Sequence, residues 1–343
     1  IFVAAPVMAA AINCPSLIIE DAITYLRVGA FTIVFNGVMI AGSGTLRGWG
    51  ETRILLVLGT LAYMAYLATS YVLVFGWGPF PEWGVFGSAV ATLVIRMLAV
   101  VAILCVIGSH LKWTPSFWRR GWDETMDRIR QMFQLSWPAA LDNLAYGFYQ
   151  MILVSFIAPF SVAMLLSRTF TLVLSAVLTV VLMSISQASE VLVGYHYGAK
   201  RFRKLSQCVM QSAIAASILT TALAILLYIF TEPLIKLFTD QTTIHGLVKE
   251  LLLLTIFVQP FSAVNTILFH SLKTLGDVKI PVAGTQIMMW GLSVPMAYFL
   301  TVSSGMGVIG LWYVLIMEEL LKALFLMLRW CLRFRKYSKP DIG

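Results

Sequence analysis

The sequence predicts an all-α integral membrane protein, and three observations indicate this fold class. Hydrophobic residues make up 59% of the chain and charged residues 12%, whereas a soluble domain carries about 25% charged residues. The hydrophobic residues form runs longer than about 18 residues, which is enough for a helix to cross a bilayer. The runs do not alternate apolar with polar residues as barrel strands do, and open sheets cannot span lipid.

Nine runs are long enough to be complete membrane spans. The opening run, residues 1–13, is shorter and predicts a partial span. The nine expected spans are 22–46, 53–76, 85–108, 136–159, 163–195, 207–230, 248–271, 280–302 and 308–331.

A short basic turn occurs twice, at 45–54 and at 271–280. Both copies carry a hydroxyl residue, Leu, a base, Gly, an acid, a base and Ile at matched positions. A second matched pair, Gly84–Gly87 and Gly307–Gly310, follows in the same order. The duplication predicts two six-helix lobes related by a pseudo-two-fold axis along the membrane normal. The first lobe would then be incomplete, with about a hundred residues, or roughly three spans, expected before Ile1.

The basic residues indicate orientation. The net charge is +8, but most bases lie in gaps between spans on one side of the predicted topology, so the charge does not point to nucleic acid. The positive-inside rule makes this side and the C-terminus cytoplasmic. The expected organisation is part of the first lobe over 1–108, an amphipathic connector on the membrane over 109–130, the second lobe over 131–336 and a tail over 337–343.

The sequence offers no catalytic or metal-binding pattern. The four cysteines are scattered, which predicts neither a disulfide framework nor a metal site. The four histidines lie near helix ends, where solvation or packing is expected. No H-E-x-x-H, G-x-S-x-G, P-loop or paired-acid motif is present, so we expect no enzyme and no cofactor.

Asp142 is the first functional candidate, because burying an ionisable group in a span is costly. It lies one turn after Pro138, and Tyr146 and Gln150 follow on the same helical face, with Asn143 beside it. The alternative interpretation is a carboxylate that stabilises a helix N-terminus.

Glu190 is the second candidate, sharing a polar face with Gln187; the alternative is an acid at the membrane interface. Asn36 and Asn265 are further polar candidates within spans.

Glu318 and Glu319 fall in the middle of the last span, with Lys322 one turn later. An internal ion pair is the favoured interpretation of these three residues.

The chain resembles the multidrug and toxic compound extrusion (MATE) family of the polysaccharide-exporter and flippase superfamily. The order and spacing of several motifs over nearly the whole chain carry the resemblance. They are YLR at 25–27, LRGWGETR at 46–53, VFG at 74–76, GVFGSAVAT at 84–92, PAALDN at 138–143, LVGYHYGAKR at 192–201 and LKTLGD at 272–277.

The resemblance implies twelve helices in two lobes around a cavity that alternates between membrane faces, so that this chain would hold helices four to twelve. Such an N-terminally truncated chain is not expected to transport on its own. The resemblance also implies a monomeric protein of the cell membrane, in contact with lipid, that exports cationic or lipophilic small molecules in exchange for H⁺ or Na⁺.

The known ion sites of the family are not intact here. The Asn and Asp of helix five correspond to Tyr66 and Ser70, the Glu of helix seven falls near Tyr146, and the Asp of helix ten falls near Ser262. Proton coupling through Asp142 or Glu190 is the expectation that remains. The alternatives are a lipid-linked oligosaccharide flippase, which would need a strongly basic cavity, and a membrane-embedded enzyme, which would need paired acids or metal ligands in a span.

Overall fold

The computed structural model describes residues 6, 19–77, 81–111, 122–239 and 241–335. The regular structure of these residues is helical throughout. The chain divides into two compact units, Ile1–Gly121 and Trp122–Gly343, which are described separately.

The first unit consists of α2 (Ile19–Gly48), α3 (Thr52–Phe75) and α4 (Gly84–Leu111). α4 packs against both α2 and α3, around buried residues that include Leu46, Leu73 and Ile95. Only 6% of the most apolar stretch of α2, and the same share of α3, is buried. The remaining apolar side chains point outward, as expected for helices surrounded by hydrocarbon or by further helices.

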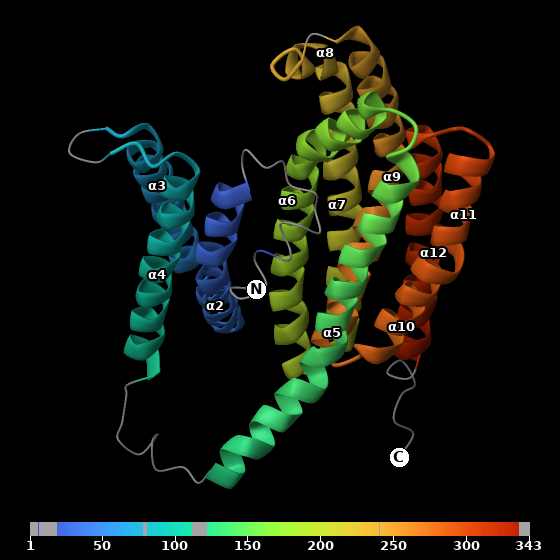
Figure 1. Ribbon diagram of the computed structural model, residues 1–343. Helices are drawn as coiled ribbons and strands as arrows, with labels where there is room; N and C mark the ends of the chain where they lie inside the picture. The colour runs from blue at the N-terminus through green and yellow to red at the C-terminus, as the bar shows by residue number, and fades with distance from the viewer. Residues whose placement is uncertain (1–5, 7–18, 78–80, 112–121, 240, 336–343) are drawn as a thin grey trace. The chain divides into compact units, whose positions relative to one another are not determined.

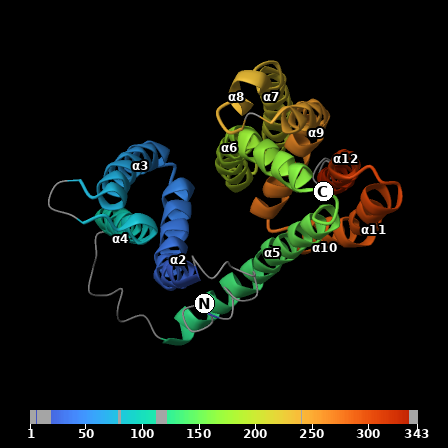
Figure 2. The same ribbon diagram turned by 45° about the horizontal axis from the view of Figure 1, so that its top comes forward.

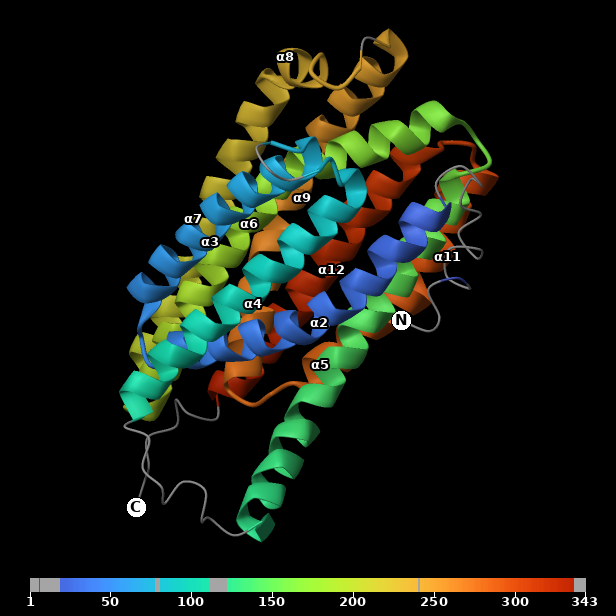
Figure 3. The same cartoon turned by 60° about the vertical axis from the view of Figure 1, so that its left-hand side comes forward.

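The second unit contains the other helices, drawn from green to red in Figure 1. They are α5 (Trp122–Ile157), α6 (Val162–Gly198), α7 (Phe202–Ile229), α8 (Thr231–Ile235), α9 (Thr242–Thr274), α10 (Lys279–Met288), η2 (Met289–Ser293), α11 (Val294–Tyr298), η3 (Phe299–Ser303) and α12 (Val308–Arg335). α9 is central: it contacts α6, α7 and α12 and lies between α7 and α12 in Figure 2. Half of its most apolar stretch, 50%, is buried. The short α8 joins α7 to α9 at one tip of the unit (Figure 3).

Several hydroxyl side chains inside the spans form their hydrogen bonds within their own helix. Thr171, Thr220 and Thr255 each donate to the backbone carbonyl four residues earlier. Such bonds allow a polar side chain to be buried where no water is present.

The nine expected spans are all helical. The last part of the expected connector is helical too, and its position on the membrane stays a prediction. α5 begins at Trp122, not at 136, so residues 122–130 of the expected 109–130 connector are the first turns of this helix. Hydropathy marks where a helix leaves the apolar layer, and it does not mark where the helix itself begins. The central part of the connector, the 1–13 run except Pro6 and the 337–343 tail lie outside the described residues.

The expected span 280–302 is one helix interrupted by two π-helical segments, η2 and η3. Pro295 is the second residue after the end of η2. Proline lacks an N–H and crowds the carbonyl one turn earlier, so a locally widened helix accommodates it.

Six described helices, α2, α3, α4, α6, α7 and α9, are long and apolar enough to cross a membrane by length and composition. The chain is therefore a multi-pass membrane protein. α5 and α12 are long helices outside this set. Both carry several polar residues in their spans, including Asp142 on α5 and Glu318 on α12.

The two copies of the basic turn have the same local geometry. Gly50 and Gly276 adopt φ of 83° and 76°, which glycine tolerates best. In each copy the glycine N–H bonds the carbonyl three residues earlier, and the following acid's N–H bonds the Leu carbonyl. The second pair, Gly84 and Gly307, also shares positive φ, at 50° and 58°. The rotation expected to relate the two lobes involves both units, so it stays a prediction.

Candidate functional site

The second unit contains a cavity of about 370 Å³ within its helices. It is lined from α5, α6, α9, α10, η2 and α12, so segments far apart in the sequence meet there. The lining residues are Asp142, Asn143, Tyr146, Met183, Asn265, Thr266, Phe269, His270, Lys273, Thr285, Gln286, Met289, Glu319 and Lys322.

Asp142 lines this cavity, as expected for a functional candidate. Its Oδ1 accepts a hydrogen bond from Gln286 Nε2 of α10 at 2.6 Å. The Gln286 Oε1 accepts in turn from Trp290 Nε1 at 3.0 Å. Asp142 is half-buried and lies well inside α5, which begins at Trp122. The alternative interpretation, a carboxylate at a helix N-terminus, is therefore wrong.

The polar stripe predicted on α5 is only partly in the cavity. Tyr146 and Asn143 line it, whereas Gln150 is not among the lining residues. Gln150 Nε2 donates to the Tyr146 hydroxyl at 2.7 Å, and its Oε1 accepts from Arg168 at 2.6 Å. Gln150 therefore links the Tyr146 hydroxyl to Arg168 without lining the cavity itself.

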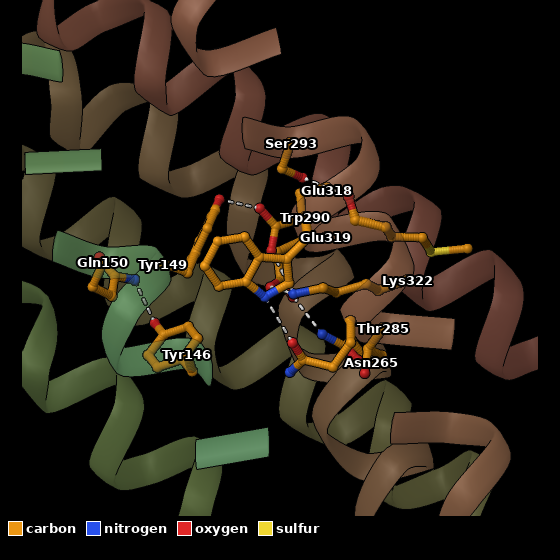
Figure 4. A network of polar contacts seen from close by, with 12 residues as sticks. Tyr146, Tyr149, Gln150, Asn265, Thr285, Trp290, Ser293, Glu318, Glu319 and Lys322 are labelled. Atoms are coloured by element: carbon orange, nitrogen blue, oxygen red, sulfur yellow. Dashed lines mark hydrogen bonds and ion pairs between the residues drawn. The ribbon is translucent and has the colours of Figure 1, made fainter. Parts of the chain in front are cut away.

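The deepest charges of the unit come from α12. Glu318 is 2% exposed and Lys322 is 7% exposed. The expected internal ion pair is confirmed, because Lys322 Nζ pairs with Glu318 Oε1. Figure 4 shows the Lys322 side chain reaching toward the two neighbouring glutamates.

Each of these glutamates also has a partner on another helix. Tyr149 of α5 donates its hydroxyl proton to Glu318, and Asn265 of α9 donates to Glu319 Oε2 at 2.8 Å. Glu319, Lys322 and Asn265 all line the cavity.

Glu190 does not line the cavity but contacts a residue that does. Its Oε1 is 2.6 Å from His270 Nδ1, and His270 is a lining residue whereas Glu190 and Gln187 are not. His270 thus forms a polar contact between α9 and α6, and the solvated or packing role expected of it stays a prediction.

Asn36 does not lie in the unit that contains the cavity, and its role in a site stays a prediction. It belongs to α2 of the first unit, where its side-chain oxygen accepts from Arg96 of α4, whereas all lining residues belong to the second unit.

Sequence reasoning missed Gln286, Thr285 and Lys273 as lining residues. A glutamine next to a threonine inside an apolar span was the available signal for the first two.

The cavity has mixed charge. Asp142 and Glu319 are acidic, and Lys273 and Lys322 are basic. Such a lining can hold a cation or a proton at a carboxylate, and it lacks the strongly basic character expected of a flippase for lipid-linked sugars. In the described parts of the chain, no three His, Cys, Asp or Glu side chains gather as a metal site.

Comparisons with known proteins agree with this architecture. The MatE family model matches residues 138–299, which run from within α5 to the first residue of η3. The uncharacterized transporter YisQ of Bacillus subtilis is 27% identical over 313 residues, covering 91% of this chain and 69% of YisQ. A probable multidrug resistance protein NorM of Bacillus thuringiensis is 22% identical over 329 residues, covering 94% of this chain and 73% of its own length.

Solved structures show the same fold. The outward-facing conformation of a multidrug resistance MATE family transporter matches with a TM-score of 0.84 at 19% identity, covering 99% of this chain and 77% of that protein. The Vibrio cholerae MATE transporter VcmN, in its bent form, matches with a TM-score of 0.79 at 14% identity, covering 98% of this chain and 75% of VcmN. The two-lobe, all-α membrane bundle predicted from the sequence is thus confirmed as the fold class.

The family-model match, the transporter relatives and the shared fold agree with one another and with the repeated turn motifs. They indicate a transporter of small molecules rather than an enzyme, and they show that the chain is similar to transporters of the MATE family.

Proposed function

We propose that the chain exports organic cations or lipophilic drugs in exchange for H⁺ or Na⁺, by alternating access. The observation that carries the proposal is the cavity of the second unit, where Asp142 and Glu319 face a space of about 370 Å³ among apolar helices. A carboxylate in such surroundings favours a bound cation or proton over the bare charged form.

Exchange follows if one carboxylate cannot hold both ligands. A proton or metal ion on Asp142 removes the charge that attracts a cationic substrate, and the substrate leaves. Loss of the ion restores the charge and allows the next substrate to bind. The cavity must open to one membrane face at a time for this to produce net export.

The basic residues of the loops support an orientation with the duplicated turns and the C-terminus in the cytoplasm. We further propose that the protein works as a monomer in contact with membrane lipid.

Transport of ethidium into or out of proteoliposomes that contain the full-length protein tests the function. Under a pH gradient or a Na⁺ gradient, Asp142→Asn and Glu319→Gln are each expected to reduce ethidium exchange by at least about tenfold, equivalent to roughly 1.4 kcal/mol of lost binding. Glu190→Gln distinguishes Asp142 from Glu190, the two candidates derived from the sequence. Glu190 is not a lining residue, so its substitution is expected to reduce ethidium exchange less than Asp142→Asn does.

Glu232→Gln is the matched control: this acid on α8 pairs with Lys236 at the surface and is 69% exposed. Exchange at the wild-type rate in both Asp142→Asn and Glu319→Gln would show that the cavity is not the transport site.

A further inference from the structure

Lys322 lies where two glutamates of the same helix converge. Glu318 and Glu319 precede it by four and three residues, so both can reach its ammonium group on one side of α12. Lys322 Nζ pairs with Glu318 Oε1 and lies 4.0 Å from Glu319 Oε1.

The remaining oxygens of the two glutamates are also occupied. Tyr149 donates to Glu318 Oε2, and Asn265 Nδ2 donates to Glu319 Oε2. Two carboxylates and a phenol together offer the oxygen-rich surroundings that a hard metal cation prefers. Here the positive charge within those surroundings belongs to the protein itself.

We propose that Lys322 acts as a tethered cation, which takes the place of Na⁺ between Glu318 and Glu319 and makes this cavity selective against Na⁺. The inference rests on the proposed antiport function and assigns protons as its coupling ion. The lysine ammonium is a compact point charge on a flexible chain, suited to this substitution.

The exclusion follows from charge repulsion. A Na⁺ ion between the glutamates would lie about 4 Å from the ammonium, and at an effective dielectric constant of about 20 this weakens binding by roughly a thousandfold. A proton on Glu319 meets the same repulsion from the ammonium, but a proton bonds to a single carboxylate oxygen and needs no coordination sphere. Asp142, which also lines the cavity, can therefore accept it.

Ion binding to the purified full chain in detergent tests the inference without transport. NaCl is titrated against choline chloride at equal ionic strength while the melting temperature and tryptophan fluorescence are recorded; Trp290 is hydrogen-bonded to the lining residue Gln286. The wild type is expected not to respond to Na⁺. Lys322→Met is expected to gain a rise in melting temperature of roughly 3–6 °C at Na⁺ tenfold above its Kd.

The double variant Glu318→Gln with Lys322→Met is the matched control. It also lacks the ammonium but keeps only one of the two carboxylates, so its Na⁺ response should be absent or far weaker. A wild type that binds Na⁺ as tightly as Lys322→Met, or a Lys322→Met that folds and does not respond, would overturn the inference.

Proteoliposomes that contain the full-length wild-type protein provide a second test that does not depend on a folded variant. A pH gradient is expected to drive ethidium exchange, and a Na⁺ gradient at constant pH is not. Exchange driven equally well by Na⁺ refutes the selectivity of Lys322. Absence of exchange under both gradients counts against the proposed antiport, while the ion titrations still decide the role of Lys322.

Discussion

Asp277→Asn is expected to destabilise the second unit through the loss of one buried charge. Asp277 is the acid of the second basic turn and is 9% exposed. Its Oδ2 lies 2.9 Å from Arg329 Nε and 3.0 Å from Arg333 Nη1. Arg333 also donates to the carbonyl of Leu275 at 2.7 Å, so this carboxylate helps to hold the start of α10 against α12.

The magnitude follows from how much water reaches the three side chains. Removing one partner of a fully buried ion pair costs about 3–5 kcal/mol. The side chains of Arg329 and Arg333 are 29% and 20% exposed, so water screens part of the interaction. We therefore expect a loss of about 2 kcal/mol, or a fall in melting temperature of about 4–8 °C for a unit of this size.

The duplication supplies a matched control, because Glu51 is the corresponding acid of the first turn. The α4 positions that match Arg329 and Arg333 hold Val106 and His110, and the ring of His110 contacts Trp49. Glu51→Gln should therefore change stability by no more than about 0.5 kcal/mol, as ordinary surface substitutions do.

Thermal unfolding of the purified chain in detergent, at one heating rate for all variants, measures the difference. Equal melting temperatures for Asp277→Asn and Glu51→Gln would refute the reasoning.

Two further predictions concern the backbone, and the same melting assay checks both. Gly310→Ala is expected to cost about 1–3 kcal/mol, because its Cβ would lie 2.9 Å from the Leu300 carbonyl; Gly246→Ala, which meets nothing within 4 Å, should gain about 0.5–1 kcal/mol. Lys200→Gly is expected to stabilise the protein by about 1 kcal/mol, because Lys200 has φ of 55° and left-handed backbone is costly for a side chain; no gain over wild type would contradict this. Ala199→Gly, at φ of −78°, is its control and should be destabilising.

The helices could be predicted from the sequence because a membrane leaves one strong signal, a long apolar run. The apolar run does not show where a helix continues beyond the membrane. Residues 122–135 of α5 are rich in charge and still helical, because a helix that enters water keeps its internal hydrogen bonds. The π segments around Pro295 leave no mark in composition, and only the proline itself indicated an irregularity.

The site could be predicted only in part, because its contacts join residues far apart in the chain. Asp142 was identified from its place in a span, but its partner Gln286 is 144 positions away. Lys322 and Glu318 are close in sequence, so their pairing could be inferred from helical spacing alone. Tyr149, 169 positions from Glu318, could not be assigned to that pair before the helices were packed.

The polar content of a span itself indicates which helices enclose a cavity. Lipid can cover an apolar helix on every side, but it cannot solvate a carboxylate, so a span that carries several polar groups must turn them toward protein or water. α5 and α12 are the long described helices outside the set that is apolar enough to span a membrane. They supply Asp142, Glu319 and Lys322 to the cavity.

α9 shows the limit of this rule. It is apolar enough to span a membrane, and it still contributes Asn265, His270 and Lys273 to the lining. Its polar residues occupy one stretch near its C-terminal end, and an average over its most apolar part does not register them. A local count of polar residues, taken turn by turn on one helical face, is therefore the better sequence indicator of a cavity than the hydropathy of a whole span.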